Sequence, residues 1–464
     1  MIFKQYYLGC LSHASYLIGD QSTGRAVVVD PQRDVSDYLA DADSAGLKIE
    51  RVIETHFHAD FLSGHLELAA ATGATISYGA AAIGRTEFAI EPLDHGQVLE
   101  LGEVRLEIRA TPGHTPESIS VVVFESADDK TGHAVLTGDT LFIGDVGRPD
   151  LLSSEGSSAD ALARQLYHSL HAQLLTLADD TLVYPAHGAG SACGKNLSTD
   201  TVSTIGEQRR SNYALAPMSE DAFVDVVTHG QAAAPMYFAF AAKRNRESRS
   251  TLDESEKPAA LSLDDSLDAQ QRGSVVIDTR DANEYAAGHL RGSINVGLGG
   301  RFAEYTGEVV RAGTSIVLIT ESGHEEEARI RLARIGFDSI DGALVNPLPS
   351  LAARPDVTER ASRLTAQQLR SLTSEPSPPK IVDVRGPGEV EAGMIPGATH
   401  LQLSQLVDRI DELDPKAPTI VYCAGGYRSS IAASTLRHHG FTDVSDLLGG
   451  YGAWTALDAA GTTD

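Results

Sequence analysis

Residues 419–441 read TIVYCAGGYRSSIAASTLRHHGF. An apolar run typical of a buried strand ends at Cys423, and a helical pattern begins a few residues later. The glycines between them let the backbone curl so that successive N–H groups point inward, and the helix adds the partial positive charge of its N-terminus. Such a loop stabilises a thiolate, so we expect Cys423 to be a nucleophile.

The residues around this cysteine complete a predicted sulfur site. Arg428 is placed to add positive charge, which would also stabilise the extra sulfur of a persulfide. We expect that sulfur to lie in a cradle formed by Ala424, Gly425, Gly426, Tyr427 and Ser429. The alternative is a buried structural cysteine, and the glycine-rich loop argues against it.

The region before this loop belongs to an internal repeat. VVIDTRDANEYAAGHLRGSINV, residues 275–296, aligns with IVDVRGPGEVEAGMIPGATHL, residues 381–401, at a constant offset of 383 − 278 = 105 positions. We therefore predict two copies of one α/β domain with a parallel sheet, at residues 261–355 and 365–464. The aligned pairs are Asp278 and Asp383, Arg280 and Arg385, Glu284 and Glu389, and Gly292 and Gly397.

The second copy resembles the rhodanese family over residues 365–464, through the loop CxxGxRS and the upstream Asp383, Arg385, Glu389 and GMIPGA. The resemblance implies a persulfide on Cys423 that passes sulfane sulfur from a donor to an acceptor. The first copy reads IVLITESGHEEEARIRLARIGF at residues 316–337, without cysteine and with Glu325–Glu327 near the place of Arg428. Carboxylates would repel a thiolate, so we expect this domain to be inactive and to be structural or interface-forming.

Histidines and aspartates of the N-terminal part predict a metal site. They occur in ETHFHAD (54–60), TPGHTPES (111–118), LTGDTLF (136–142) and YPAHG (184–188), each after a β-rich run. Loops at one edge of a sheet can gather such imidazoles and carboxylates around an ion. The candidates are His56, His58, Asp60, His114, Asp139 and His187.

This pattern resembles the metallo-β-lactamase superfamily, and we place the domain at residues 1–240. The fold class that the whole chain predicts is therefore α/β: a metallo-β-lactamase αββα sandwich followed by two rhodanese-like α/β domains. Dinuclear zinc hydrolases of the superfamily carry HxHxDH, but here position 61 is Phe. The loss of that imidazole weakens the second metal subsite and favours a mononuclear centre.

Among mononuclear members, the pattern is most similar to the persulfide dioxygenases, which occur fused to rhodanese domains. The resemblance implies one Fe(II) per chain, held by His56, His114 and Asp139, with open positions for a persulfide and dioxygen. His58, Asp60 and His187 would then orient ligands or water, and His58 would ligate directly if the metal were zinc.

Two further residues near this site carry open interpretations. GDVGRPDL resembles the substrate-side loop of persulfide dioxygenases and glyoxalase II, so Arg148 is a candidate for binding the anionic part of a thiol carrier, with an ion pair to Asp150 as the alternative. Cys193, in HGAGSACGKN, is a possible sulfur relay. A small buried residue is the alternative that we favour for Cys193.

Composition bounds the remaining possibilities. The chain has 464 residues and a net charge of −27, which disfavours binding to nucleic acid or to an anionic membrane surface. No apolar stretch is long enough to span a membrane, no secretory signal is recognisable, and three separated cysteines argue against a disulfide framework. We expect a cytoplasmic homo-oligomer, with a polar linker at residues 241–260.

These inferences converge on one function and two alternatives. The first is oxidation of a low-molecular-weight persulfide by dioxygen to sulfite and thiol at iron, coupled to sulfane-sulfur transfer that forms or consumes thiosulfate. The second is a zinc thioester hydrolase of glyoxalase II type with appended sulfurtransferase domains. The third is sulfurtransfer alone, with a redox-silent first domain.

Overall fold

The computed structural model describes residues 1–151 and 158–461 of the chain. The chain divides into two compact units. Unit 1 contains Met1–Gln231 and Phe238–Glu254, and unit 2 contains Ala232–Tyr237 and Ser255–Asp464.

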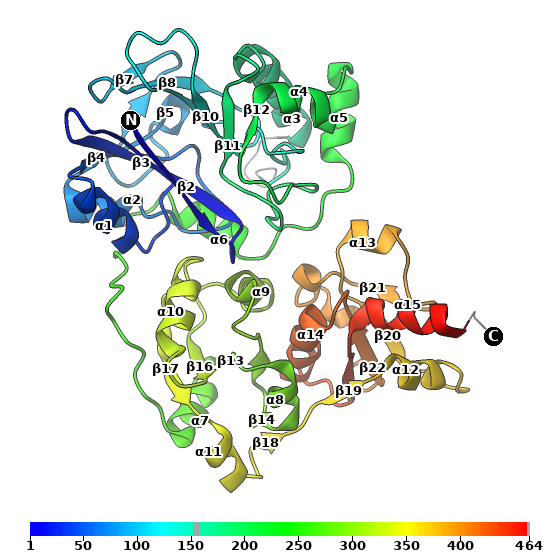
Figure 1. The fold of residues 1–464 in the computed structure, drawn as a ribbon. Coiled ribbons are helices and arrows are strands. Elements are labelled where there is room, and N and C mark those ends of the chain that lie inside the picture. The colour runs from blue at the N-terminus through cyan, green and yellow to red at the C-terminus, as the bar shows by residue number, and fades with distance from the viewer. Residues whose placement is uncertain (152–157, 462–464) are drawn as a thin grey trace. The chain divides into compact units, whose positions relative to one another are not determined.

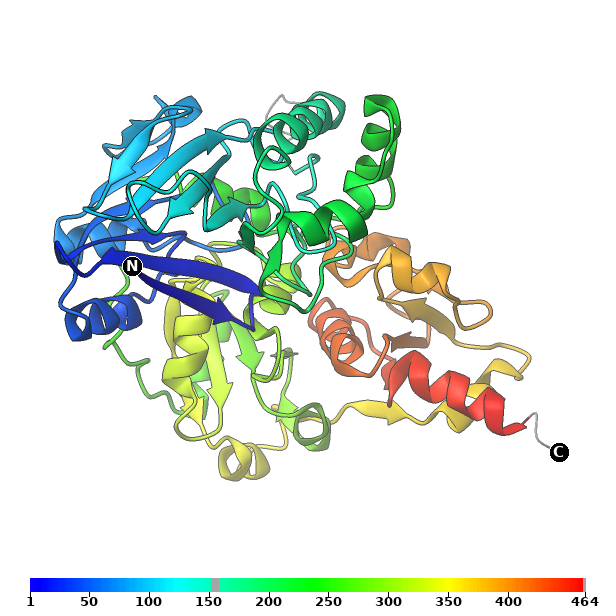
Figure 2. The same ribbon diagram turned by 45° about the horizontal axis from the view of Figure 1, so that its top comes forward.

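Two sheets lie at the centre of unit 1. The first has the strand order β1-β2-β3-β4-β5-β6, with β1 to β3 antiparallel and β3 to β6 parallel; its first two strands are the long dark-blue pair in Figure 2. Its strands are β1 (Ile2–Leu8), β2 (His13–Asp20), β3 (Arg25–Val29), β4 (Lys48–Ile53), β5 (Thr75–Gly79) and β6 (Glu91–Leu93). The second has the order β12-β11-β10-β9-β8-β7, with strands β7 (Val98–Glu100), β8 (Arg105–Ala110), β9 (Ile119–Phe124), β10 (Ala134–Gly138), β11 (Leu182–Pro185) and β12 (Ser203–Thr204).

Helices cover the outer faces of both sheets. Figure 1 shows α1 and α2 on one side of unit 1 and α3, α4 and α5 on the other. The helices of this unit are α1 (Ser36–Ser44), α2 (His65–Thr72), α3 (Ala159–Ser169), α4 (Ile205–Ser211), α5 (Glu220–Thr228) and α6 (Phe238–Arg244), with short turns η1 (Ala80–Ala82), η3 (Leu170–Leu174) and η4 (Tyr213–Leu215).

Alternation along the strands explains this layering. On β3, Val27 and Val29 join the apolar cluster between the sheets, whereas Val28 joins the cluster beneath α1 and α2. On the second sheet, Val122 faces outward and packs with residues of α3 and α5. Successive strand residues point to opposite faces, so fully apolar strands are buried on both sides. The predicted αββα sandwich is confirmed.

The strand ends of unit 1 position the candidate metal ligands. His56 follows β4, His114 follows β8, Asp139 follows β10 directly, and His187 follows β11. Segments far apart in sequence therefore bring these side chains into one buried cluster.

Unit 2 contains two parallel sheets, one for each copy of the repeat. Their strand orders are β15-β13-β16-β17 and β19-β23-β22-β20-β21. The strands are β13 (Val275–Asp278), β15 (Ile294–Asn295), β16 (Ile316–Thr320), β17 (Ile340–Val345), β19 (Ser362–Leu364), β20 (Lys380–Asp383), β21 (Thr399–His400), β22 (Thr419–Tyr422) and β23 (Val444–Leu447), beside a small pair formed by β14 (His289–Leu290) and β18 (Thr358–Glu359).

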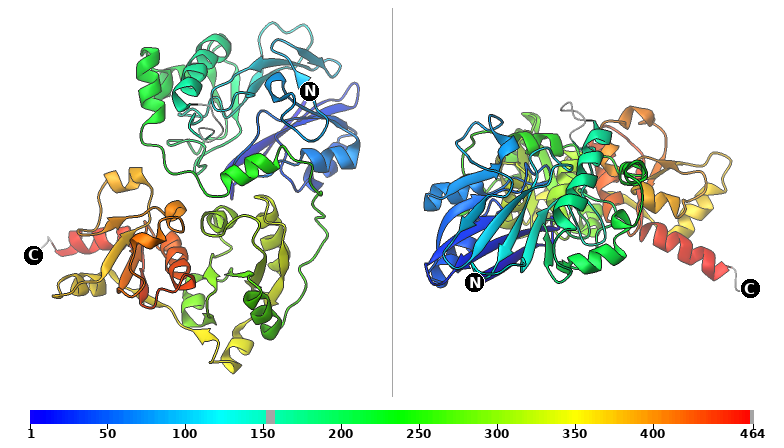
Figure 3. Two further views of the ribbon diagram at one scale, coloured as in Figure 1. Left: turned by 180° about the vertical axis from the view of Figure 1, so that it is seen from behind. Right: turned by 90° about the horizontal axis from the view of Figure 1, so that it is seen from above.

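Helices flank both sheets of unit 2. Figures 1 and 3 show α14 on one side of the C-terminal sheet and α12 and α15 on the other, where they pack on Ile381, Ile420 and Leu447. The elements are α7 (Leu263–Gln271), α8 (Ala282–Ala287), α9 (Phe302–Val309), α10 (Glu325–Ala333), α11 (Leu348–Ala353), α12 (Ala366–Thr373), α13 (Pro387–Glu391), η5 (Leu403–Gln405), η6 (Ile410–Glu412), α14 (Tyr427–His438) and α15 (Gly450–Gly461).

The repeat extends to the register of the strands. Asp278 pairs with Ile319 on the neighbouring strand, and Asp383 pairs with Tyr422 in the same way. The residue after Tyr422 is Cys423, and the residue after Ile319 is Thr320. Threonine therefore occupies the cysteine position of the first copy.

Within the part of the chain that the structure describes, every helix is too short or too polar to cross a bilayer.

Candidate metal centre and sulfur-transfer site

Hydrogen bonds fix the orientation of His56. Its Nδ1 lies 2.9 Å from the Thr55 hydroxyl, which itself donates to Asp30 at 2.8 Å. The hydroxyl proton is used on the carboxylate, so the hydroxyl oxygen accepts from Nδ1–H of the imidazole. The lone pair of His56 is therefore on Nε2, which faces the cluster.

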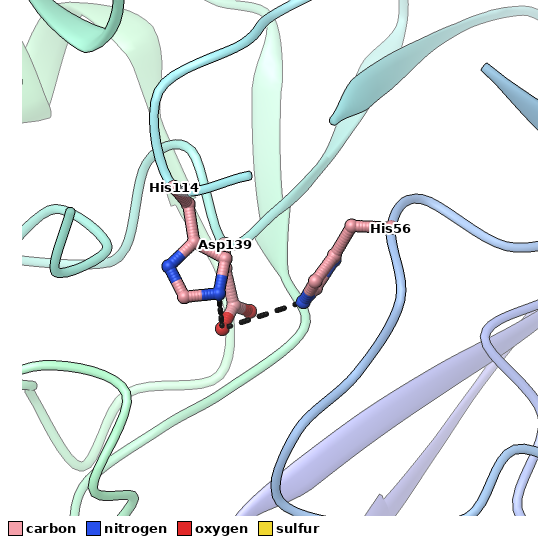
Figure 4. A group of neighbouring side chains, drawn as sticks. All are labelled: His56, His114 and Asp139. Carbon is pink, nitrogen blue, oxygen red and sulfur yellow. Dashed lines mark ion pairs between the residues drawn. The ribbon is translucent and has the colours of Figure 1, made fainter. Parts of the chain in front are cut away.

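His114 is oriented in an equivalent way from a different loop. Its Nδ1 lies 2.9 Å from the carbonyl oxygen of Arg148, so Nδ1 carries the proton and Nε2 is free to ligate. The Nε2 atoms of His56 and His114 lie 3.8 and 3.5 Å from Oδ2 of Asp139. Figure 4 shows the three side chains converging from their separate loops.

These three residues fit a divalent metal ion. All are buried, and Nε2 of His56 and Oδ2 of Asp139 have no hydrogen-bond partner in the structure. Buried polar atoms without partners are costly, and an ion among them would satisfy them. Two imidazoles and one carboxylate are the donor set that non-heme iron shares with other transition metals.

His187 lies beside this triangle between two carboxylates. Its Nδ1 is 2.8 Å from Oδ1 of Asp139, and its Nε2 is 2.7 Å from Oδ2 of Asp60. Burial lowers the pKa of His187, but these carboxylates raise it well above its ordinary value. The hydrogen bond between Nδ1 of His187 and Oδ1 of Asp139 orients the carboxylate whose other oxygen faces the triangle.

His58 lies beside the triangle, with its ring 4.0 Å from that of His56 between centroids, and it forms with Asp60 and His187 a further set of ligand atoms within 4.8 Å of one another. It also reaches a second buried group. Its Nε2 lies 3.2 Å from Asp30 and 3.7 Å from Glu54, and Glu54 in turn is 3.4 Å from Nδ1 of His65. Burial raises the pKa of Glu54. Glu54 and His65 were not among the predicted residues, although Glu54 begins the ETHFHAD motif and His65 lies five residues after its end.

Phe61 fills the place where hydrolases of the superfamily have an imidazole. Its ring is buried and lies 4.0 Å from the ring of His13 and 4.5 Å from that of His58, measured between centroids. An apolar ring therefore packs beside the histidines where a further ligand would otherwise stand.

Asn245 holds the loop that carries these ligands. Its Nδ2 donates to the carbonyls of His58 and Phe61, both at 2.8 Å, and its Oδ1 accepts the Ser63 N–H at 2.9 Å. Asn245 is fully buried. The composition of residues 241–260 predicts a linker, and this prediction is wrong up to Glu254, because the segment packs on the metal loop as part of unit 1.

Arg148 and Cys193 lie on adjacent loops near the cluster. The guanidinium of Arg148 is buried and donates to both oxygens of Asp150, at 2.7 and 2.6 Å, so the predicted alternative, an ion pair, is formed. Cys193 is buried, and its sulfur lies within 4.8 Å of ligand atoms of Asp139 and His187. Burial raises the pKa of the Cys193 thiol.

The C-terminal copy forms the predicted cysteine loop. Cys423 is buried at the end of β22, and the N–H of Gly426 points to its sulfur at 3.1 Å. Gly426 has a φ of 109°, a left-handed conformation that glycine adopts readily, and it precedes the first residue of α14. Ser429 Oγ is 3.6 Å from the sulfur, and Arg428 makes a two-pronged pair with Glu389 at 2.7 Å for each bond.

Comparisons with known proteins agree with this geometry. The model of the metallo-β-lactamase superfamily matches residues 8–187, and the model of the rhodanese-like domain matches residues 262–342 and 365–457. The chain is thus a metallo-β-lactamase-fold domain followed by two rhodanese-like domains.

Similar proteins assign the N-terminal half of the chain to one family within this superfamily. Human mitochondrial persulfide dioxygenase ETHE1 is 31% identical over 234 residues, which cover 50% of this chain and 82% of that protein. The chain belongs to the persulfide dioxygenase family through its N-terminal half, and it is an enzyme. A metallo-β-lactamase of Staphylococcus aureus, known from a crystal structure, is 33% identical with a TM-score of 0.67 and covers 74% of this chain and 98% of its own. A hydroxyacylglutathione hydrolase of Polaromonas sp. is 34% identical over 189 residues, which cover 40% of this chain and 66% of that protein.

Proposed function

We propose that unit 1 oxidises a low-molecular-weight persulfide with dioxygen to sulfite. We also propose that Cys423 transfers sulfane sulfur to sulfite, which forms thiosulfate, or takes it from thiosulfate in reverse. In the first reaction RSSH, O₂ and H₂O give RSH, sulfite and two protons. The outer sulfur is oxidised, and dioxygen is reduced. The observation that carries this proposal is the buried triangle of His56, His114 and Asp139 with both imidazole lone pairs facing inward.

Iron is the cofactor that we propose for this triangle. Bound there, Fe(II) would supply the redox chemistry that dioxygen requires and that zinc lacks. The packing of Phe61 against His13 and His58 supports a single ion, because it removes a ligand from the neighbouring position. The resemblance to persulfide dioxygenases supports the same assignment.

The surrounding residues would keep the ligand set in one protonation state. Thr55 and the carbonyl of Arg148 hold the protons of His56 and His114 away from the ion. His187, paired with Asp60, holds Oδ1 of Asp139, so the unpartnered Oδ2 is the oxygen left for an ion. His58 would act through Asp30 in orienting this loop.

Cys423 would carry the sulfur-transfer half of the reaction. Its thiolate attacks the outer sulfur of a second RSSH, which forms the S–S bond of a Cys423 persulfide and releases RSH. Sulfite then attacks the outer sulfur, the S–S bond breaks, and thiosulfate leaves with the Cys423 thiolate regenerated. Run in reverse, the same steps consume thiosulfate. The Gly426 N–H and the pair formed by Arg428 and Glu389 support this role.

Two roles predicted from the sequence stay proposals for the persulfide site. Binding of the thiol carrier by Arg148 would require its guanidinium to hold both Asp150 and a substrate anion. A sulfur relay by Cys193 would require its buried thiol to lose a proton, against the direction in which burial raises its pKa. A cytoplasmic location and a homo-oligomeric state likewise stay predictions.

A zinc thioester hydrolase is the second candidate. The similarity to a hydroxyacylglutathione hydrolase favours it, and the catalytic fold is shared. The apolar ring of Phe61 argues against it, because hydrolases with two zinc ions use an imidazole at that position.

Metal analysis combined with oxygen uptake tests the proposal. The full chain, given glutathione persulfide, should contain one iron and consume oxygen with release of sulfite. His114→Ala should lose both the iron and the uptake, whereas the matched change His95→Ala, at an exposed histidine outside the cluster, should keep both. Zinc in place of iron, with hydrolysis of lactoylglutathione and no oxygen uptake, would establish the hydrolase instead.

A further inference from the structure

A polar stripe along α14 joins the persulfide loop to the cysteine-free domain. The hydroxyl of Tyr427 lies 2.6 and 2.9 Å from the carbonyl oxygens of Gly297 and Gly299. Further along the helix, Ser430 donates to the Asn295 side chain at 2.7 Å, Ser434 accepts the Asn295 N–H at 2.9 Å, and His438 Nδ1 lies 2.7 Å from the Gly292 carbonyl.

The spacing of these residues places them on one face of the helix. Positions 427, 430, 434 and 438 differ by three or four residues, which is the spacing of neighbours on one helical face. All their partners lie on or beside β15 of the cysteine-free domain. This face of α14 therefore docks on the other copy of the repeat rather than on its own sheet.

The first member of the stripe is part of the loop that holds Cys423. Tyr427 directly follows Gly426, whose N–H points to the sulfur. The next residue, Arg428, is tied to Glu389 of its own domain. The start of α14 is thus held on two sides, by the cysteine-free domain through Tyr427 and by the catalytic domain through Arg428.

We call the hydrogen bonds from the Tyr427 hydroxyl to the carbonyls of Gly297 and Gly299 the tether, and the surroundings of Tyr427 stabilise it. Its ring meets that of Tyr305, on α9, edge to face at a centroid distance of 5.5 Å. Burial raises the pKa of the Tyr427 phenol, so the hydroxyl keeps the proton that it donates. A single proton serves both carbonyls, so the tether is worth one hydrogen bond shared between two acceptors.

We propose that the cysteine-free domain contributes to the sulfur-transfer site. It does so through Tyr427, the positioning residue that keeps the Gly426 N–H directed at the sulfur of Cys423. This inference rests on the proposed role of Cys423. The tether holds the first turn of α14, and that turn sets the direction of the donor that stabilises a thiolate or a persulfide. Without it, the turn frays, and the donor leaves the sulfur.

Tyr427→Phe in the full chain tests this inference, because it keeps the ring and its contact with Tyr305 but removes the tether. We expect kcat for sulfur transfer from thiosulfate to cyanide to fall about fivefold, the effect of one ordinary hydrogen bond, with KM little changed. Alkylation of Cys423 by iodoacetamide at pH 7, followed by mass spectrometry of its peptide, should slow by a similar factor.

Ser434→Ala is the matched control. It removes one bond of the same stripe, two helical turns from the loop, so it should lower the thermal unfolding temperature without changing kcat or the alkylation rate. The tether would be overturned if Tyr427→Phe had the wild-type kcat and alkylation rate, or if Ser434→Ala lowered these two quantities equally. Absence of sulfur transfer in the unmodified chain would overturn the role of Cys423 instead, and the alkylation rates would still decide on the tether.

Discussion

The two copies of the repeat in unit 2 have one scaffold and two different loops. In both, an aspartate at the end of an inner strand binds the arginine two residues later: Arg280 Nε lies 2.9 Å from Asp278, and Arg385 Nε lies 2.9 Å from Asp383. Both arginines also donate to a glycine carbonyl eight residues further on, Gly288 and Gly393. The scaffold has therefore been kept to the level of single hydrogen bonds.

The difference lies in what the loop N–H groups bind. In the C-terminal copy the N–H of Gly426 points to the sulfur of Cys423. In the other copy, Thr320 stands at the cysteine position, and the N–H of Gly323 donates to the carboxylate of Glu325 at 2.8 Å. The anion that the loop would bind has been replaced by a side chain of the loop itself. One fold thus presents a cysteine at this loop in one copy and a carboxylate in the other.

We expect the largest effect from removing the sulfur of Cys423 in the C-terminal copy. Cys423→Ser should lower thiosulfate formation from persulfide and sulfite at least about a thousandfold, since no persulfide can form on the serine. Oxygen uptake should persist, because the metal cluster lies in unit 1. Sulfite and thiosulfate would be measured together by chromatography. If uptake also disappeared, the two activities would not be separate. Cys10→Ser, at a cysteine of neither site, is the control that shows whether any cysteine loss has this effect.

Removing the aspartate carboxylate that the two copies share should lower the free energy of unfolding equally in both. Asp278→Asn and Asp383→Asn each leave a buried guanidinium without its carboxylate, and we expect a loss of about 3 kcal/mol in the free energy of unfolding for each. Urea denaturation followed by circular dichroism would measure both variants. A loss confined to Asp383→Asn would mean that the ion pair serves the chemistry of the active copy and not the scaffold.

The sequence predicts well whatever depends on local order. Asp139 directly follows a strand, and His56 and His114 follow strands by a few residues, so their place at strand ends could be predicted from the chain. The expectation of one sheet edge was wrong, because β4 belongs to the first sheet and β8 and β10 belong to the second. The repeat could be predicted because Asp278 and Asp383 occur in matching contexts. The replacement of cysteine by Thr320 then follows from the strand register.

Contacts between distant segments could not be predicted in this way. Asn245 lies 182 positions from its partner Ser63, within a charged segment whose composition is typical of a linker. Tyr427 was predicted only as part of the cradle, and its partner Gly297 lies 130 positions away in the other copy. One sequence gives the tendency of each segment, but not which segments meet in the fold.

A smaller effect is expected at the carboxylate that holds Arg428. Glu389→Gln removes the charge from a two-pronged pair, and we expect kcat/KM for sulfur transfer to fall about tenfold, the value of one charge-assisted hydrogen bond. Glu284, the matching residue of the cysteine-free copy, is exposed, so Glu284→Gln should change nothing. Equal losses in both variants would show that net charge, rather than the pair, is responsible.

We expect the smallest effect from introducing a thiol into the cysteine-free copy. Thr320→Cys places it at a buried hydroxyl that has no hydrogen-bond partner, so the domain should fold normally. In a Cys423→Ser background we expect no sulfur transfer, because Glu325 still occupies the Gly323 N–H. Adding Glu325→Ala frees that donor and should speed iodoacetamide alkylation of the introduced thiol about fivefold. An alkylation rate that is high before Glu325 is removed would mean that the carboxylate does not silence this loop, and that the loss of the cysteine alone separates the two copies.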